Sequence, residues 1–180
     1  MPGLPLARAR LGGLSQGGVE LNIRPDDLHG LEIQTLLQEH LSHMRAISPP
    51  DSVHALDLAR LRRPDIRFWT AWNGNDLLGC GALKRLGEHD GEIKSMRTAA
   101  RHQRRGVGRA VLSHIVAHAQ ADGVQRLWLE TGSTDHFAPA RRLYAEYGFQ
   151  PCGPFADYRE DPHSAFMRLD LRPLTPAKHA

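Results

Sequence analysis

The chain has 180 residues and a formal net charge of +3, with 23 lysines and arginines against 20 aspartates and glutamates. That length fits one domain with a sizeable core, and so small an excess of positive charge does not by itself indicate a nucleic-acid-binding protein. The two cysteines, Cys80 and Cys152, have no CxxC spacing, and no apolar run approaches the ~20 residues of a membrane span. We therefore expect a soluble, cytoplasmic protein with reduced thiols and no membrane partner.

The first part of the chain predicts a tail, a strand and a pair of helices. Residues 1–18 are rich in glycine and lack the apolar core of a signal peptide, so we expect a flexible N-terminal tail. Residues 19–23 alternate as a strand, and residues 28–44 space their leucines as an amphipathic helix. The two prolines at 49–50 break the chain before a second short helix, which Ser52 could cap.

The middle of the chain predicts a meander of three antiparallel strands. The dipeptides Asn73-Gly74 and Asp90-Gly91 separate these strands, and both dipeptides tolerate the positive φ of tight turns. The expected strands are residues 66–72, 77–86 and 92–98.

The second half of the chain predicts alternating helices and strands. The expected elements are a helix over 106–121, a strand over 126–131, a helix over 136–149 and a strand over 165–171. Pro139 falls in the first turns of the second of these helices, and Gly148 stands at its end. We therefore predict one α/β domain over residues 19–172 with a mixed sheet, followed by a C-terminal tail over 173–180.

The stretch RHQRRGVGRA, residues 101–110, carries the clearest chemical signal. It is not a P-loop, because no Lys-Ser/Thr pair follows the glycines to reach a γ-phosphate or Mg²⁺. It is not a Rossmann fingerprint, because Val111 stands where the third glycine belongs and the preceding residues are polar. The arginines lack the interleaved aromatic side chains of a nucleic-acid groove, which leaves nucleic-acid binding as a weaker alternative.

A pyrophosphate cradle fits the same residues. Gly106 and Gly108 would let the backbone approach an anion closely, and the free amides at the start of the following helix would point towards it. Arg104, Arg105 and Arg109 would add to the positive potential of the helix dipole. From this stretch alone, a glycine-rich helix entry with solvated arginines is an equally good interpretation.

Two motifs together resemble the GNAT superfamily of N-acetyltransferases. QRRGVG, residues 103–108, matches the motif Q/R-x-x-G-x-G/A, and ARRLYAEYGF, residues 140–149, resembles the second signature, A-x-x-L-Y-x-x-x-G-F. The order of the expected elements also fits that fold, a central, mostly antiparallel sheet flanked by helices. The resemblance covers residues 19–172, and within the superfamily the chain is most similar to a bacterial branch of small acetyltransferases. It implies that the loop binds the pyrophosphate of acetyl-CoA.

The resemblance implies a donor site made mostly of backbone. The residues that it assigns to cofactor binding are Met96, Arg97, Thr98, Gln103, Arg104, Arg105, Gly106, Val107, Gly108 and Arg109. The loop amides would bind the pyrophosphate and the preceding strand would pair with the pantetheine arm, while the Met96 amide would polarise the thioester carbonyl. Acetyl-CoA is then a co-substrate, and no metal is implied.

Tyr144 is the expected catalytic acid. It matches the tyrosine with which the family protonates the departing CoA thiolate, and a phenol with a pKa near ~10 is a proton donor at neutral pH. Tyr147, three residues later, is expected to pack as a structural aromatic residue instead.

A general base is needed because an alkyl amine with a pKa of about 10 is mostly protonated at neutral pH. Glu92 is the first candidate, since it starts the strand before the loop, where histone acetyltransferases of the superfamily carry a glutamate. Strand alternation would place it on one face with Lys94, Met96 and Thr98. Three alternatives are an ion pair of Glu92 with Lys94 or an arginine, Glu130 as the base, and an ordered water.

The acceptor is expected between the first helix pair and the C-terminal loop. Hydroxyl, imidazole and aromatic side chains there suit a small polar amine, including one that carries a carboxylate. The candidates for binding it are Ser52, His54 and Tyr158, with Ser48 close by. Each of them could instead belong to an ordinary helix connection or surface turn.

Two pairs of histidines stand at helical spacing. His114 and His118 are four residues apart, which could suit a shared metal ion, but no third ligand or following glutamate accompanies them. We expect this pair, and His40 and His43 on the first helix, to be surface residues.

The sequence therefore predicts an N-acetyltransferase that moves the acetyl group of acetyl-CoA to a primary amine of a small polar metabolite, by direct attack in a ternary complex. A covalent acetyl-Cys152 intermediate is a weaker alternative. The same donor site would also serve a protein or peptide N-acetyltransferase acting on lysine or N-terminal amines, or a non-enzymatic acetyl-CoA-binding regulator. Homodimerisation through an edge strand is left open.

Overall fold

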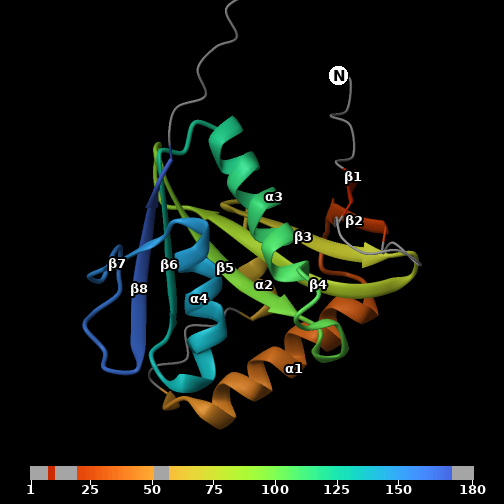
Figure 1. The fold of residues 1–180 in the computed structure, drawn as a ribbon, viewed down its shortest axis with the longest axis horizontal. Coiled ribbons are helices and arrows are strands. Elements are labelled where there is room, and N and C mark those ends of the chain that lie inside the picture. The colour runs from red at the N-terminus through yellow and green to blue at the C-terminus, as the bar shows by residue number, and fades with distance from the viewer. Residues whose placement is uncertain (1–7, 11–19, 51–56, 172–180) are drawn as a thin grey trace, which may run out of the picture.

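The fold is that of a computed structural model, which describes residues 8–10, 20–50 and 57–171. In this part of the chain one eight-stranded sheet, in the order β1-β2-β3-β4-β5-β6-β8-β7, carries helices on both faces (Figure 1). The strands are β1 (Arg8–Arg10), β2 (Glu20–Pro25), β3 (Ile66–Asn73), β4 (Asp76–Arg85), β5 (Asp90–Thr98), β6 (Arg126–Gly132), β7 (Gln150–Cys152) and β8 (Ser164–Asp170). The helices are α1 (Leu31–Ile47), α2 (Leu58–Leu61), α3 (Val107–Ala121) and α4 (Ala138–Tyr147), with single 3-10 turns at η2 (Ala100–His102) and η3 (Asp135–Phe137).

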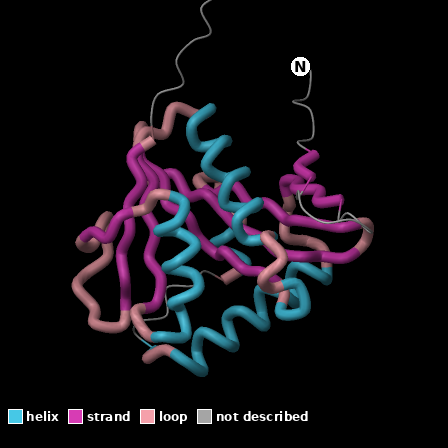
Figure 2. The backbone as a smooth tube through the Cα atoms, viewed as in Figure 1, coloured by secondary structure: helices cyan, strands magenta, loops and turns pink. Residues whose placement is uncertain are grey.

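Both faces of the central strands are buried under helices, so these strands contribute to two separate cores (Figure 2). Neighbouring residues of β4 alternate between them: Leu78 packs with the residues of α3, and Leu77 with those of α1. Burial on both faces explains why residues 77–83 form a continuous, mostly apolar run. The helices within the described residues are too short or too polar to cross a membrane.

The predicted meander is confirmed, because β3, β4 and β5 pair antiparallel in that order. Its first turn is displaced by one residue from the predicted position. Asn73 and Asp76 still pair across the strands, so the turn residues are Gly74 and Asn75, with Gly74 at φ 57°. Glycine suits this position because other residues adopt positive φ only at a cost.

The prediction of a turn at Asp90-Gly91 is wrong. These two residues begin β5, and residues 86–89 connect it to β4. Close packing explains the glycine at position 91, and an ion pair explains the aspartate at position 90. A Cβ atom at Gly91 would lie 2.9 Å from Leu83 Cδ1, and the Asp90 carboxylate binds Arg126 on the neighbouring strand.

Both edges of the sheet differ from the sequence prediction. Arg8–Arg10 pair with β2 as strand β1, so the N-terminal tail expected over residues 1–18 holds a strand. β7 is an element that the sequence does not predict, and it contains Pro151. Proline is tolerated there because β7 lies at the edge of the sheet, where its missing amide breaks no ladder.

The first two helices also differ from the prediction. α1 begins at Leu31, whose side chain is 76% exposed rather than part of the buried stripe, while Leu28 is buried ahead of the helix. The described turn of α2 is capped by Asp57, whose carboxylate accepts a hydrogen bond from the Arg60 amide at 2.9 Å. Ser52, the expected cap, lies outside the described residues.

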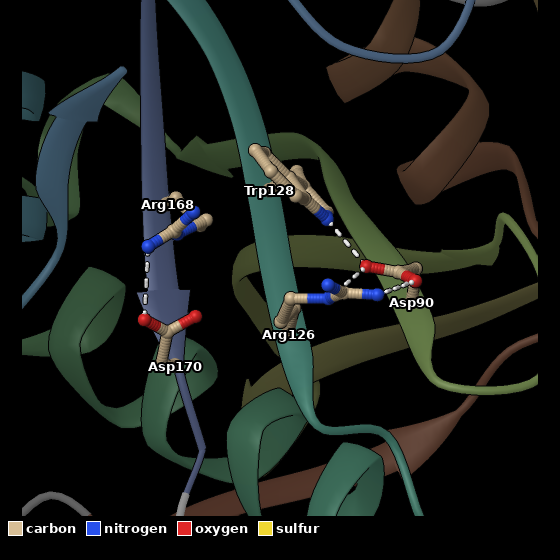
Figure 3. A network of polar contacts seen from close by, with 5 residues as sticks. All are labelled: Asp90, Arg126, Trp128, Arg168 and Asp170. Atoms are coloured by element: carbon tan, nitrogen blue, oxygen red, sulfur yellow. Dashed lines mark hydrogen bonds and ion pairs between the residues drawn. The ribbon is translucent and has the colours of Figure 1, made fainter.

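The parallel strands β5 and β6 are fastened to each other at one end only. Their register spans three residues, beginning with Asp90 opposite Arg126. The Asp90 carboxylate accepts hydrogen bonds at 2.8 Å from Arg126 Nε and from Trp128 Nε1 (Figure 3). On β8, Arg168 lies 5.5 Å from the centroid of the Trp128 ring and pairs with Asp170. These contacts hold the two strands together at this end, whereas their other ends are not paired with each other.

Candidate functional site

A cleft of about 970 Å³ opens where β5 and β6 separate. Past Glu92 and Trp128 the two strands no longer pair, although β5 continues to Thr98 and β6 to Gly132. The walls of the cleft come from these two strands, the loop before α3 with the first turn of that helix, α4 with the segment before it, and one side of α1. The cleft therefore brings together elements from both faces of the sheet.

A bulge in β5 decides which side chains reach the cleft. Ser95 and Met96 stand opposite the single Gly81 of β4, and Ser95 adopts the left-handed conformation at φ 53°. Met96 points towards α3, since a Cβ atom at Gly81 would lie 2.6 Å from its sulfur. Glu92 and Lys94 precede the bulge and point to the opposite face. The prediction that Glu92, Lys94, Met96 and Thr98 share one face is therefore wrong. The bulge shifts the alternation by one residue and separates the first two of these residues from the last two.

The loop before α3 presents unpaired amides to the cleft. Gly106 caps α3 in the left-handed conformation at φ 81°, and Arg104 has φ 58°. The helical hydrogen bonds begin with the Ala110 amide, which donates to the Gly106 carbonyl at 3.0 Å, so the amides before it have no helical acceptor. Gly108 lies close to α4, since a Cβ atom there would be 3.3 Å from Leu143 Cδ2. This geometry can bind an anion through the backbone and the helix dipole.

The residues predicted to bind the donor lie together, with one exception. Those that line the cleft are Met96, Arg97, Thr98, Gln103, Arg104, Gly106, Val107, Gly108 and Arg109. Arg105 is exposed and does not line it. Arg109 forms an ion pair with Glu146 of α4, with 2.6 Å between Nη2 and Oε2. The loop and α4 are thereby linked at this end of the cleft.

Tyr144 lines the cleft from α4 and is largely buried. Its ring contacts Phe149 edge-on, with 5.7 Å between the ring centroids. Burial, together with the negative charge of Glu130, raises the pKa of the Tyr144 hydroxyl. The side chain is therefore protonated at neutral pH and can donate a proton. Tyr147 packs against the core on the same side, as expected of a structural residue.

Glu92 belongs to a buried polar triad with Lys94 and Tyr158. Its Oε1 atom accepts hydrogen bonds from Lys94 Nζ at 2.7 Å and from the Tyr158 hydroxyl at 2.6 Å. The Lys94 ammonium also donates to the Tyr158 oxygen at 2.8 Å. Lys94 lines the cleft, whereas Glu92 and Tyr158 lie behind it. Burial and the charge of Glu92 raise the pKa of Tyr158, so the hydroxyl stays protonated as a donor to Glu92.

Glu130 lines the cleft from β6. Burial raises the pKa of its carboxyl to about 7, although a hydrogen bond from Ser164 Oγ at 2.8 Å and the charge of Lys94 favour the ionised form. A carboxyl group that titrates near neutrality can accept a proton and release it again. The alternative base of the sequence prediction thus stands in the cleft, while the first candidate is ion-paired behind it.

One side of α1 forms a further wall of the cleft. His40, Met44 and Ser48 line it at four-residue spacing, which places them on one stripe of the helix. The expectation that His40 is a surface residue is wrong. Burial and the charge of Arg97 lower the pKa of His40 to about 4, so its ring is neutral at pH 7. The four-residue spacing is the sequence signal that could have identified this wall.

Two histidines join α1 to the segment before α4. The Nε2 atoms of His43 and His136 are 2.8 Å apart, and His136 lines the cleft, so the contact bridges two of its walls. Burial and the charges of Arg97 and His136 lower the pKa of His43, which favours the neutral ring that the contact requires. Two residues predicted to bind the acceptor, Ser52 and His54, lie outside the described residues.

His114 and His118 are half-buried, and the expectation that they lie on the surface is wrong. Their ring centroids lie 5.6 and 5.2 Å from that of the buried Trp69, so the pair packs α3 against β3. Burial and the charge of His118 lower the pKa of His114 to about 4. Across the described ranges, no group of three or more His, Cys, Asp and Glu side chains could hold a metal ion.

Comparisons with known proteins agree with the geometry. Residues 31–149 match the model of the acetyltransferase (GNAT) family. The N-acetyltransferase YsnE of Bacillus subtilis is 56% identical over 84% of this chain and 100% of its own length, and the N-acetyltransferase YedL of Escherichia coli is 49% identical over 83% and 94%. The crystal structure of a Bacillus subtilis acetyltransferase in complex with CoA has the same fold, with a TM-score of 0.64 at 19% identity over 85% of this chain and 100% of that one.

Gly106→Glu should abolish the stabilisation of this protein by acetyl-CoA. A carboxylate on the loop would repel the pyrophosphate and obstruct its approach to the amides. At a concentration 100 times its Kd, acetyl-CoA should stabilise the wild type by about 2.7 kcal/mol. For a chain of this size that corresponds to a rise in Tm of roughly 5–10 °C. Thermal unfolding with and without the ligand, at fixed salt, measures it.

Gly123→Glu is the matched control for this experiment. Gly123 has φ 77° and open space around it at the far end of α3, so both variants introduce the same charge at a left-handed position. Both should lower the Tm of the free protein, but Gly123→Glu should keep the rise caused by acetyl-CoA. The assignment of the loop is wrong if the two variants respond alike to the ligand.

Proposed function

Because the chain belongs to the GNAT family, it is an N-acetyltransferase that uses acetyl-CoA, and we propose that its acceptor is the primary amine of a small polar metabolite. The observation that carries this proposal is the contact between His43 and His136, which joins α1 to the segment before α4. A polypeptide acceptor needs an open groove, whereas this bridge ties two walls of the cleft together. A cleft narrowed in this way favours a small acceptor over a polypeptide.

Direct attack of the amine in a ternary complex is supported by the position of the cysteines. A covalent acetyl-enzyme requires a nucleophile in the cleft. Burial raises the pKa of Cys80 to about 12, and it raises that of Cys152 on β7 as well. Neither residue lines the cleft, so the acetyl-Cys152 alternative finds no support here.

The open edge of β5 suits the pantetheine arm and the thioester. Beyond Glu92 this edge has no partner in β6, so its backbone groups can pair with an extended ligand that carries amides. Met96 follows the bulged residue Ser95, and we assign its amide to the thioester oxygen, which becomes negatively charged in the transition state.

Tyr144→Phe should lower kcat by about 100-fold, because it removes the proton donor to the departing thiolate. The KM for acetyl-CoA should change little, since the phenyl ring keeps its packing on Phe149. A thiol reagent that reports free CoA measures both constants. Tyr147→Phe makes the same chemical change three residues away, and an equal loss of kcat in that variant would contradict the role of Tyr144.

We assign the general base to Glu130 rather than to Glu92. The Glu92 carboxylate is paired with Lys94 and accepts a hydrogen bond from Tyr158, so it would have to give up these partners to take a proton. Glu130 faces the cleft, and its raised pKa of about 7 matches the proton affinity needed of a base at neutral pH.

The kcat/KM of the wild type should rise with pH up to about 7 and then level off, because Glu130 must be ionised to take the proton of the bound ammonium. In Glu130→Gln the inflection should move to the pKa of the free amine, near ~10. Glu92→Gln should move the inflection only slightly below 7, because the charge of Glu92 is a minor cause of the raised pKa of Glu130. The variant should unfold at lower temperature, because Lys94 loses its paired carboxylate. The opposite result in the two variants would transfer the role of base to Glu92.

Turnover with two matched panels of amines tests the proposed acceptor class. One panel holds small polar primary amines, and the other offers the same amine groups at the N-terminus or on a lysine of a short peptide. The kcat/KM values should be higher for the free small amines. Faster turnover of the peptides would establish the protein N-acetyltransferase alternative instead.

A further inference from the structure

Arg97 brings a positive charge into the cleft that no carboxylate of the described residues pairs with. It follows the bulge in β5, and its partner across the strand pair is Cys80, which belongs to the core under α1. Partners in a strand pair point to the same face, so the Arg97 side chain points towards α1. Its Nε atom is buried and has no hydrogen-bond partner in the described part of the chain.

The other cations of the cleft differ from Arg97. Lys94 is neutralised by Glu92 within the buried polar triad, and Arg109 is paired with Glu146. Arg104, in the donor loop, and Arg142, on α4, also line the cleft, but both are exposed to solvent. A buried guanidinium nitrogen without an acceptor is unfavourable, so the charge of Arg97 calls for an anionic ligand.

His40 lies close to Arg97, and it too has a buried polar atom without a hydrogen-bond partner. The charge of Arg97 is one cause of the lowered pKa of His40, which places the two groups near each other. The Nδ1 atom of His40 is also buried without a hydrogen-bond partner in that part of the chain. Two unsatisfied polar atoms, one from β5 and one from α1, therefore belong to residues that line the same cleft.

We propose that Arg97 binds a carboxylate of the acceptor, so that the substrate is a small amino acid, with its amine and its carboxylate in one molecule. This inference rests on the proposed function. The planar guanidinium presents two parallel donors, which match the two oxygens of a carboxylate. The neutral ring of His40 adds a polar contact to the same group without adding charge.

The charges at the two ends of such a substrate orient it for the reaction. Arg97 attracts the carboxylate, while Glu130 attracts the ammonium and takes its proton. The free amine then forms the bond from nitrogen to the acetyl carbon as the carbon–sulfur bond breaks. Tyr144 gives its proton to the departing thiolate, and the nitrogen loses its second proton as the amide forms, which restores the Tyr144 hydroxyl. The proton held by Glu130 passes to solvent, so that the products are the N-acetyl amino acid and CoA.

A series of matched acceptors tests this proposal. Each set contains an amino acid, its carboxamide and the amine without the carboxyl group, with aliphatic, thioether and aromatic side chains represented. In the wild type the kcat/KM should be about 10- to 100-fold higher for the amino acid than for its carboxamide, as expected for hydrogen bonds to a charged group. Arg97→Met should remove most of this preference through the KM of the amino acid. Arg97→Lys should keep part of it, because the charge remains without the planar fork.

Two controls separate the proposal from its alternatives. Arg45→Met removes an exposed cation of α1 and should keep the preference. Calorimetric titration of the CoA-loaded protein with the amino acid and its carboxamide should give the same ratio of affinities, independently of turnover. Aminosulfonate and aminophosphonate analogues should be poorer acceptors than the amino acids, and equal or better turnover of either would overturn the carboxylate assignment.

Three results would overturn the role of Arg97. These are equal turnover of amino acids and carboxamides by the wild type, an unchanged preference in Arg97→Met, and a rise in the KM of acetyl-CoA in that variant without a change for the amino acid. A different result would contradict the proposed function. If no small amine is turned over while acetyl-CoA still stabilises the protein, the acceptor class is wrong, and the calorimetric ratio still decides whether Arg97 binds a carboxylate.

Discussion

The short pairing between β5 and β6 is the constraint on which the site depends. Strands that separate inside a sheet leave backbone donors and acceptors without partners, which is unfavourable unless something else satisfies them. Here the pairing ends after three residues, and the ion pair between Asp90 and Arg126 holds the closed end. The two strands therefore separate only beyond Glu92 and Trp128. It creates a strand edge in the interior of the molecule, and a ligand with amides of its own can satisfy that edge.

Burial and pairing give the ionisable groups of the site different tasks. Glu92 and Lys94 are buried together, so their charges cancel and they stabilise the strand on which the cleft is built. Glu130 is half-buried, and the neutral Ser164 hydroxyl is its only hydrogen-bond partner within the described ranges, so its pKa rises to about 7. Arg97 keeps its charge and is left with an unsatisfied nitrogen. The role of each group therefore depends less on its distance from the others than on whether its charge is already paired.

The loop proposed to bind the donor could be located from sequence because its role depends on backbone. A loop that binds an anion through amides needs glycines at fixed spacing before a helix, and Gly106 and Gly108 meet that need within ten residues. The bulge in β5 could not be predicted, since nothing in the composition of that strand marks an extra residue. A shift of one residue reverses every side chain after it, which is why Met96 lies on the face opposite to Glu92.

The part of the cleft proposed to bind the acceptor was less accessible to sequence reasoning, because its lining consists of side chains from α1, β5 and β6, which only the fold brings together. His40 shows the difficulty: a histidine in a polar helix has the same sequence context whether it faces water or a cleft. This division also has a chemical consequence. In the proposed mechanism backbone amides bind the part of the donor that every reaction shares. Substitutions on the α1 stripe or at Arg97 would then change the acceptor and leave intact the roles proposed for Gly106 in binding acetyl-CoA and for Tyr144 in protonating its thiolate.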